Sequence, residues 1–216
     1  MELYFAPLAC SLATRIALYE AGEPARYTQA DTETKKLSDG SDFFAVNPMG
    51  QVPALRLKDG SILTENTAIL QYVADRLPHA QLAPTDARGR SHMQQWLGFI
   101  GTEVHKAIFI PLLDDKASEE VKRYSRDKIS RRMSVLQNHL RGREYVLDSF
   151  SIVDAYLTTI LNWANASKVD LQQWPEVYEY YQRMLKRPSI ARAVGEEFAL
   201  YKEEVARKKR PVAAAV

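Results

Sequence analysis

The sequence is poor in cysteine: its 216 residues contain a single one, Cys10. One cysteine cannot form a disulfide within the chain, which excludes the small disulfide-stabilised secreted domains and favours a reducing cytoplasm. The chain also lacks an excess of one charge, with 29 basic against 27 acidic residues. This balance argues against a nucleic-acid partner, which would select a strongly basic surface. The basic segment 207–210 near the C-terminus is expected to be a solvated chain end.

Long apolar runs are scarce as well. No stretch approaches the ~18 consecutive apolar residues typical of a membrane-spanning helix, so no membrane partner is expected. The first ten residues, MELYFAPLAC, lack the basic start and apolar core of a secretory signal. His79, His92 and His139 show no metal-ligand grouping, so neither a metal nor a bound cofactor is expected. The remaining composition, 46% hydrophobic and 26% charged, is that of an ordinary globular protein.

The first 78 residues predict a small α/β domain with a mixed sheet. The apolar runs VPALRL and SILT flank Lys58-Asp59-Gly60, and an Asp-Gly between two short apolar runs predicts a hairpin. The complete predicted order is strand 2–5, helix 12–21 ending before Gly22, strand 25–30, a helical turn at 42–46, the hairpin, and a helix from Glu65.

The rest of the chain is predicted to be all-helical. Pro78, Pro84 and little periodicity mark 79–86 as a linker, which leaves 87–216 as a second domain. Helices are expected around Met93–Val104, over 118–140, after Ser151, over 176–186 where Pro188 ends the helix, and over 196–208. Ser151 and Asp154 form an S-x-x-D capping box before an apolar run, a structural feature. The fold class is therefore α/β plus all-α.

Cys10 lies at the start of the predicted helix 12–21, after the predicted strand 2–5 and a short loop. Helix N-termini stabilise a thiolate, so this position predicts a lowered pKa and a reactive thiol. The second cysteine of a dithiol site would be at residue 13, which is alanine. A monothiol can still form a mixed disulfide with an external thiol or hold one nearby. The competing interpretation is a buried small hydrophobe.

Two further segments allow a structural and a functional interpretation. Pro53 can simply begin a strand, or the Val52-Pro53 bond can be cis and turn the Val52 backbone towards an extended ligand. Glu65 and Asn66 stand at a helix start, where they can serve as caps or meet the charged end of a ligand.

A second face runs along the first long helix. Gly98, Thr102 and His105 share a face that differs from the apolar stripe. A helix with two such faces can pack on its own domain and on the first domain, which would bring His105 and Lys106 to the cleft between them.

Five stretches carry a family resemblance: LACSLATRIALYEAG, FFAVNPMGQVPAL, LTENTAILQYVAD, QQWLGFIGTEVHK and FSIVDAYLTTILNWA. In order and spacing they resemble a cytosolic glutathione S-transferase, most closely the bacterial beta class. The resemblance implies a thioredoxin-like N-terminal domain, a helical C-terminal domain, a homodimer and a glutathione site in each subunit. It implies glutathione as cosubstrate and a hydrophobic electrophile as its partner.

The same resemblance assigns roles to individual residues. Cys10 would face the glutathione sulfur, with His105 as the second catalytic group. The resemblance implies that Val52, before a cis Pro53, pairs with the cysteinyl backbone of glutathione. The other implied glutathione contacts are Glu65 and Asn66 at the γ-glutamyl end and Lys35 at the glycyl carboxylate. Thr102, Glu103 and His105 match the helix segment that lines the site, partly across the dimer interface, and Lys106 is expected to help bind glutathione as a cationic donor to its thiolate. The electrophile is expected to lie against Phe109 and Trp163.

The sequence departs from the class at two places. Gly98 stands where the class usually has asparagine, and the loop VLDSFS before the capping box lacks the family's glycine. The reaction expected is conjugation of a glutathione thiolate to an electrophile, or thiol–disulfide exchange through Cys10. Because Gly98 removes a polar contact, the alternative is a non-catalytic protein that binds glutathione or hydrophobic ligands on the same fold.

Overall fold

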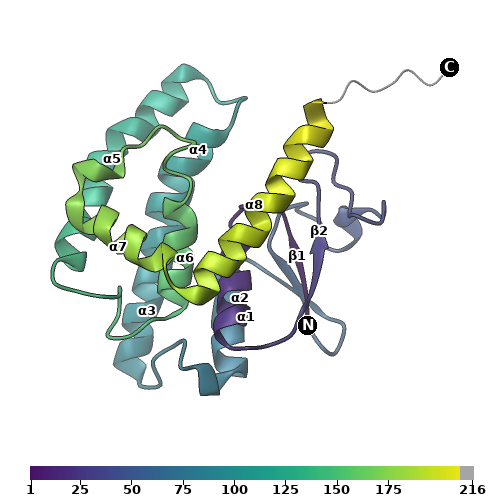
Figure 1. Cartoon of the computed structure of the whole chain (residues 1–216), viewed down its shortest axis with the longest axis horizontal. Helices are drawn as coiled ribbons and strands as arrows, with labels where there is room; N and C mark the ends of the chain where they lie inside the picture. The colour runs from purple at the N-terminus through teal and green to yellow at the C-terminus, as the bar shows by residue number, and fades with distance from the viewer. Residues whose placement is uncertain (210–216) are drawn as a thin grey trace.

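The N-terminal part is an α/β unit built on a four-stranded mixed sheet (Figure 1). The computed structural model describes residues 1–209. The strands stand in the order β2-β1-β3-β4, with β1 parallel to β2 and antiparallel to β3. The elements are β1 Glu2–Phe5, α1 Leu12–Glu20, β2 Arg26–Gln29, a 3-10 turn Phe43–Ala45, β3 Ala54–Arg56, β4 Ile62–Thr64 and α2 Asn66–Arg76. The predicted order and the mixed sheet are confirmed.

The hairpin between β3 and β4 shows how local sequence sets this topology. Gly60 has a φ of +88°, which a side chain would disfavour, and its N–H donates to the Leu57 carbonyl. The Asp59 carboxylate accepts bonds from the N–H and hydroxyl of Ser61. The Asp-Gly pair therefore forms the turn that the sequence predicts.

The C-terminal part is helical, as predicted. Side chains of Asp86, Ser118 and Ser151 cap the helices that follow them. A continuous helical run consists of α3 Ala87–Phe99, a π-helical section η3 Ile100–Phe109 and α4 Ile110–Leu113. The other main helices are α5 Glu119–Leu140, α6 Ile152–Leu161, α7 Pro175–Leu185 and α8 Pro188–Lys209.

The predicted start of the last helix is wrong. Helix α8 begins at Pro188 rather than at residue 196. Proline is suited to the first helical position, because the missing N–H would have no partner there. Pro188 therefore starts α8 after α7 has ended.

The basic segment 207–210 was expected to be a solvated chain end, but residues 207–209 belong to α8, where Lys208 pairs with Glu33 and Glu204. Residue 210 lies outside the described residues.

One hydrophobic core joins the two parts. Helix α1 packs against α2 in its own part and against α6 and α8 in the helical part. Figure 1 shows α8 running between the helical part and the sheet. The predicted linker contains a 3-10 turn, Pro78–Ala80, followed by an extended segment to α3. The domain limits 1–78 and 87–216 stay a prediction, since the core is shared.

One helix contradicts the expectation that no apolar stretch is long enough to span a membrane. By length and composition the run Ala87–Leu113 passes that test, with a mean hydropathy of 1.2 over its most apolar window. Its side chains Met93, Leu97, Ile100 and Val104 are buried in the protein core, although only 33% of that window as a whole is buried. Core helices satisfy the same criterion, so the run is weak evidence for a membrane segment.

Candidate active site

A cavity of about 280 Å³ lies between the sheet and the long helical run. It brings together eight of the twelve predicted site residues, Cys10, Val52, Pro53, Glu65, Asn66, Thr102, His105 and Lys106, and Gly98 lines it as well. The first domain supplies one wall from three separate segments, and α3, η3 and Tyr156 of α6 supply the other. The cavity is therefore the inter-domain cleft that the two faces of the long helix predict.

Cys10 lies just before the N-cap of α1 and forms part of the cleft wall. Its thiol donates to the Val52 carbonyl at 3.2 Å, and the Asn66 amide donates to the Cys10 carbonyl at 3.2 Å. Burial raises the pKa of the Cys10 thiol to about 11, although the Lys106 charge acts to lower it. The prediction of a lowered pKa is therefore wrong, because loss of hydration outweighs the helix terminus.

The loop that ends in Val52 and Pro53 forms the floor beside Cys10. The Val52–Pro53 peptide bond is cis, as the resemblance implies. The Asn47 side chain holds the loop by donating to the Gln51 carbonyl at 2.6 Å and accepting from the Met49 N–H at 3.1 Å. The loop is thus fixed by its own polar contacts, and the Val52 carbonyl is directed at the thiol.

Glu65 occupies the N-cap position of α2 with an exposed side chain. Its φ is +66°, a region that a residue with a Cβ rarely adopts, and its carboxylate makes no capping hydrogen bond. A strained residue whose carboxylate is free to meet a ligand is typical of a binding site. The functional interpretation of Glu65 therefore gains support over plain capping.

His105 closes the opposite wall. Its side chain is buried, shares a 2.7 Å hydrogen bond between Nδ1 and the Tyr156 hydroxyl, and lies 5.0 Å from the Trp163 ring, centroid to centroid. Burial and the Lys106 charge lower the pKa of His105 to about 4. His105 is therefore a neutral imidazole at pH 7, while Lys106 is the cationic group of the cleft.

Stability is expected to depend on pH through His105. Between pH 6.5 and 4 the unfolded chain binds a proton at this position that the native protein does not, so stability falls as the pH falls. A shift of this size corresponds to about 3 kcal/mol. Urea unfolding of the protein and of His105→Gln at pH 7 and 4.5 should show a shallower pH dependence in the variant. His92→Gln, which changes an exposed histidine of α3, should retain the original dependence; equal slopes in all three proteins would contradict the assignment.

Four predicted site residues do not line this cavity. Phe109 is fully buried in the core, and the Trp163 indole donates to the Leu8 carbonyl at 2.7 Å. Glu103 pairs with Arg132 of α5 at 2.8 Å. The Lys35 ammonium donates to the Gly50 carbonyl at 2.8 Å, beside the loop but outside the lining. Phe109 therefore cannot form the surface that was expected to hold an electrophile.

The sequence interpretation missed several lining residues. The structure adds Tyr156 and Leu97, together with Asn47, Met49 and Gln51 of the loop before Pro53. Tyr156 belongs to the apolar pattern of α6, so nothing in its sequence context separates it from the core. Its contact with His105 arises from packing between helices that are distant in sequence. The signal available for the loop was the stretch FFAVNPMGQVPAL, which carries the family resemblance but does not show which of its side chains line the cavity.

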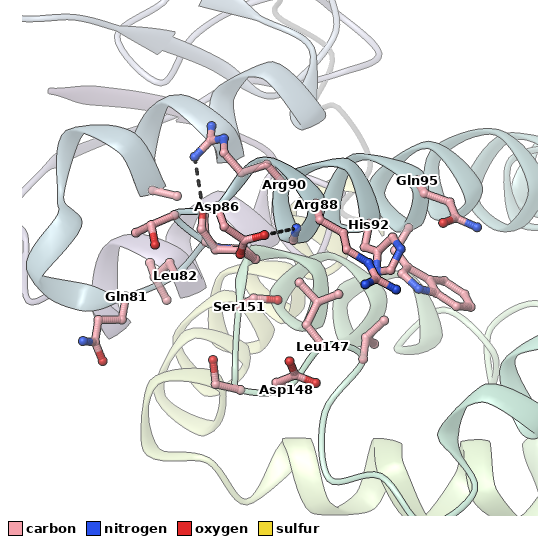
Figure 2. Close-up of a pocket in the computed structure, with 18 of the residues that line it drawn as sticks. Gln81, Leu82, Asp86, Arg88, Arg90, His92, Gln95, Leu147, Asp148 and Ser151 are labelled. Carbon is pink, nitrogen blue, oxygen red and sulfur yellow. Dashed lines mark hydrogen bonds between the residues drawn. The ribbon is translucent and has the colours of Figure 1, made fainter.

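Other potential sites show less chemistry. Within residues 1–209 no group of three or more His, Cys, Asp or Glu side chains could hold a metal ion. A larger hollow of about 1070 Å³ lies between the linker, α3 and the loop before α6 (Figure 2). Some of its polar groups pair with each other: Arg90 forms two hydrogen bonds with Asp75, and the Asp86 side chain caps α3 by accepting from the Gly89 N–H.

The loop before α6 tolerates the absence of the family's glycine. Between α5 and Ser151, all in the described part of the chain, only Gly142 has a positive φ. The Val146 N–H donates to Asp154 at 2.9 Å, which fixes the loop to the helix it precedes. The departure VLDSFS therefore needs no conformation reserved for glycine.

Comparison with known proteins gives the same family for both parts. The model of the glutathione S-transferase N-terminal domain matches residues 9–76, and that of the C-terminal domain matches residues 100–188. The chain is 41% identical to glutathione S-transferase GstA of Escherichia coli O157:H7, over 91% of this chain and 98% of that protein.

Solved structures extend the comparison to the fold. A bacterial beta class glutathione S-transferase of Sphingomonas chungbukensis is 39% identical with a TM-score of 0.87, covering 91% of this chain and 98% of that one. A sphingomonad glutathione S-transferase, solved in complex with glutathione, is 38% identical with a TM-score of 0.87 and the same coverage.

Proposed function

The chain belongs to the glutathione S-transferase family, and on that premise we propose that it joins the thiolate of glutathione to hydrophobic electrophiles in the cleft at Cys10. The observation that carries the proposal is the convergence of the Cys10 thiol, the Val52 carbonyl, the Glu65 carboxylate and the Lys106 ammonium on one cavity. These groups complement a peptide-like ligand that has a thiol, a backbone and a charged amino end.

We assign the glutathione contacts from this geometry. The Val52 backbone pairs with the cysteinyl unit, and Glu65 with Asn66 receives the γ-glutamyl end. The Lys35 ammonium, beside the same loop, is assigned to the glycyl carboxylate. Thr102 lines the cleft from η3, whereas Glu103 faces Arg132 and is assigned only an indirect role.

The proposed mechanism starts with ionisation of the bound glutathione thiol. Free thiols titrate near pH ~8.5, so at neutral pH the thiolate must be stabilised by the site. The Lys106 cation provides a charge, and the neutral His105 imidazole and Cys10 thiol can each donate a hydrogen bond. The thiol proton leaves to solvent, the sulfur bonds to the electrophilic carbon, and the leaving group departs with its electron pair.

Conjugation fits Cys10 better than disulfide exchange. Exchange through Cys10 would require its thiolate, which the raised pKa disfavours at neutral pH. A protonated thiol instead serves as a donor to the glutathione sulfur. For the electrophile, Leu97, Tyr156 and the exposed Met49 replace Phe109 as the apolar surface of the cleft.

Two finer assignments complete the proposal. The protein acts as a homodimer, which is supported by exposed apolar side chains on α4 and α5: Ile110, Leu113, Val121 and Tyr124. The single cysteine, kept as a thiol, favours the cytoplasm.

The alternative function, non-catalytic ligand binding, rests on Gly98. This residue lines the cleft, and a Cβ added there would meet nothing within 4 Å, so the missing side chain leaves open space beside the proposed site. Loss of one polar contact would weaken stabilisation of the thiolate without preventing glutathione from binding.

Calorimetric titration with glutathione, together with turnover of an aryl halide, tests the proposal. We expect micromolar to millimolar binding for the protein and for Cys10→Ser, because Cys10 contributes only one of several contacts. Turnover should fall in Cys10→Ser. Binding without any turnover in the unaltered protein would support the alternative function, and absence of binding would contradict both.

A further inference from the structure

Two hydrogen bonds from the helical part hold Leu8, a residue of the loop that carries Cys10. The Leu8 N–H donates to Glu197 Oε2 of α8 at 2.7 Å, and its carbonyl accepts from the Trp163 indole at 2.7 Å. Leu8 has a φ of +59°, which costs a leucine roughly 1–2 kcal/mol. The two hydrogen bonds therefore offset the cost of this backbone conformation at Leu8.

Glu197 is itself an unusual residue for a core. It is 0% exposed, and its other oxygen lies 2.8 Å from Nε of Arg15, which is also buried. The Arg15 guanidinium is enclosed between the rings of Phe5 and Tyr27, at 4.3 and 4.1 Å from their centroids. The Glu197 carboxylate thus pairs with Arg15 through one oxygen and accepts the Leu8 N–H through the other.

Stability alone is a weak reason for such a pair. The desolvation cost of a buried ion pair offsets most of its Coulombic attraction. Apolar residues of similar volume in the same place often stabilise the folded protein as well or better. The position of the pair suggests another role. Leu8 is two residues from Cys10, whose thiol contacts the Val52 carbonyl in the cleft proposed to bind glutathione.

We infer that Glu197 is a positioning residue for the transfer reaction: by accepting the Leu8 N–H from the far side of the loop, it sets where the Cys10 thiol stands in the cleft. The inference rests on the proposed function. It assigns Glu197 no contact with substrate. Because displacement of a catalytic group by 1 Å can cost about 100-fold in rate, a small movement of the loop suffices for a large effect.

The test compares variants that separate the loop contact from the ion pair. Glu197→Leu alone would leave Arg15 charged and buried, so the informative variant is the double change Arg15→Met with Glu197→Leu. Trp163→Phe removes the other Leu8 contact and leaves the ion pair intact. Arg15→Met with Glu197→Gln keeps an acceptor for Leu8 and leaves no unpaired guanidinium, so it differs from the first double variant only in that acceptor. Glu196→Gln is the matched control, since Glu196 also contacts Arg15, at 3.3 Å, but is 40% exposed and does not contact the loop.

Two readouts are measured on each folded variant: kcat and KM for glutathione, and the pH dependence of Cys10 alkylation by iodoacetamide. The first double variant and Trp163→Phe should lose kcat by about 10- to 100-fold. Their Cys10 should alkylate at least about tenfold faster, with its midpoint moved towards the ordinary pH of ~8.5. Arg15→Met with Glu197→Gln should retain most of the unaltered kcat and alkylation profile, and Glu196→Gln should match the unaltered protein.

Unchanged kcat and alkylation in folded Trp163→Phe and in the first double variant would overturn the inference. So would equal changes in Glu196→Gln, since that result would trace the effect to the charge of Arg15. Alkylation requires no glutathione. If the unaltered protein neither binds nor turns over glutathione, the proposed function fails, while the alkylation profiles still decide whether Glu197 positions Cys10.

Discussion

Replacing Asp154 by alanine is expected to lower the free energy of unfolding by about 4 kcal/mol. Asp154 is 0% exposed and accepts four hydrogen bonds, from the Val146 N–H, the N–H and hydroxyl of Ser151, and the Tyr180 hydroxyl. Alanine would leave these donors buried without acceptors, and each unsatisfied group costs roughly 1–3 kcal/mol before relaxation. The loop before α6 and the first turn of α6 would lose their common anchor.

Equilibrium unfolding in urea measures this effect, and Ser151→Ala is its control. That variant removes the other half of the capping box and should cost only about 1 kcal/mol, since the carboxylate keeps its remaining donors. A loss below about 1 kcal/mol in Asp154→Ala would mean that water or a shifted side chain satisfies the donors. The structural role assigned to Asp154 would then be wrong.

Replacing Glu65 by alanine is expected to weaken glutathione binding by about 10- to 100-fold. The exposed carboxylate lines the cleft and makes no capping bond, so its proposed partner is the amino group of the ligand. A hydrogen bond to a charged group is worth about 1.5–3 kcal/mol, and about 1.4 kcal/mol corresponds to a tenfold change in affinity. Calorimetric titration of the protein, Glu65→Ala and Glu65→Gln gives the series, in which glutamine should fall between the other two.

The backbone at Glu65 supplies a matched comparison. Glycine adopts a φ of +66° without the strain of a Cβ, so Glu65→Gly should be about 1 kcal/mol more stable than Glu65→Ala. Both variants lack the carboxylate and should bind glutathione equally weakly. If either variant binds glutathione with the affinity of the unaltered protein, the assignment of Glu65 to the binding site is wrong. Equal stability of the two would show that the position carries no strain.

Local signals in the sequence predicted the fold well where neighbours in the chain determine the structure. The Asp59-Gly60 hairpin and the Ser151 capping box depend on residues within a few positions, and both are confirmed. Pro188 was assigned to the end of one helix because proline is compatible with both a stop and a start. Periodicity placed His105 on a second helix face, and the cleft lies there.

The rest depends on burial and on distant contacts. The position of Cys10 at a helix start is visible in the sequence, but the desolvation that raises its pKa is not. The sequence interpretation placed Phe109 on the surface that holds the electrophile, but its side chain is buried in the core. An aromatic residue near a cleft is compatible with either position, so the sequence did not decide between them. The contact of Glu197 with Leu8 spans nearly the whole chain, and no local pattern marks either residue.

The shared core has a consequence for how this molecule can change over evolutionary time. Helix α1 belongs to the first part by chain order, but α6 and α8 of the second part cover it. If either part were replaced by that of a distant homologue, side chains that do not fit would meet where α1 packs against α6 and α8. The two parts must therefore be inherited together or substituted in step, even though each has a recognisable architecture of its own.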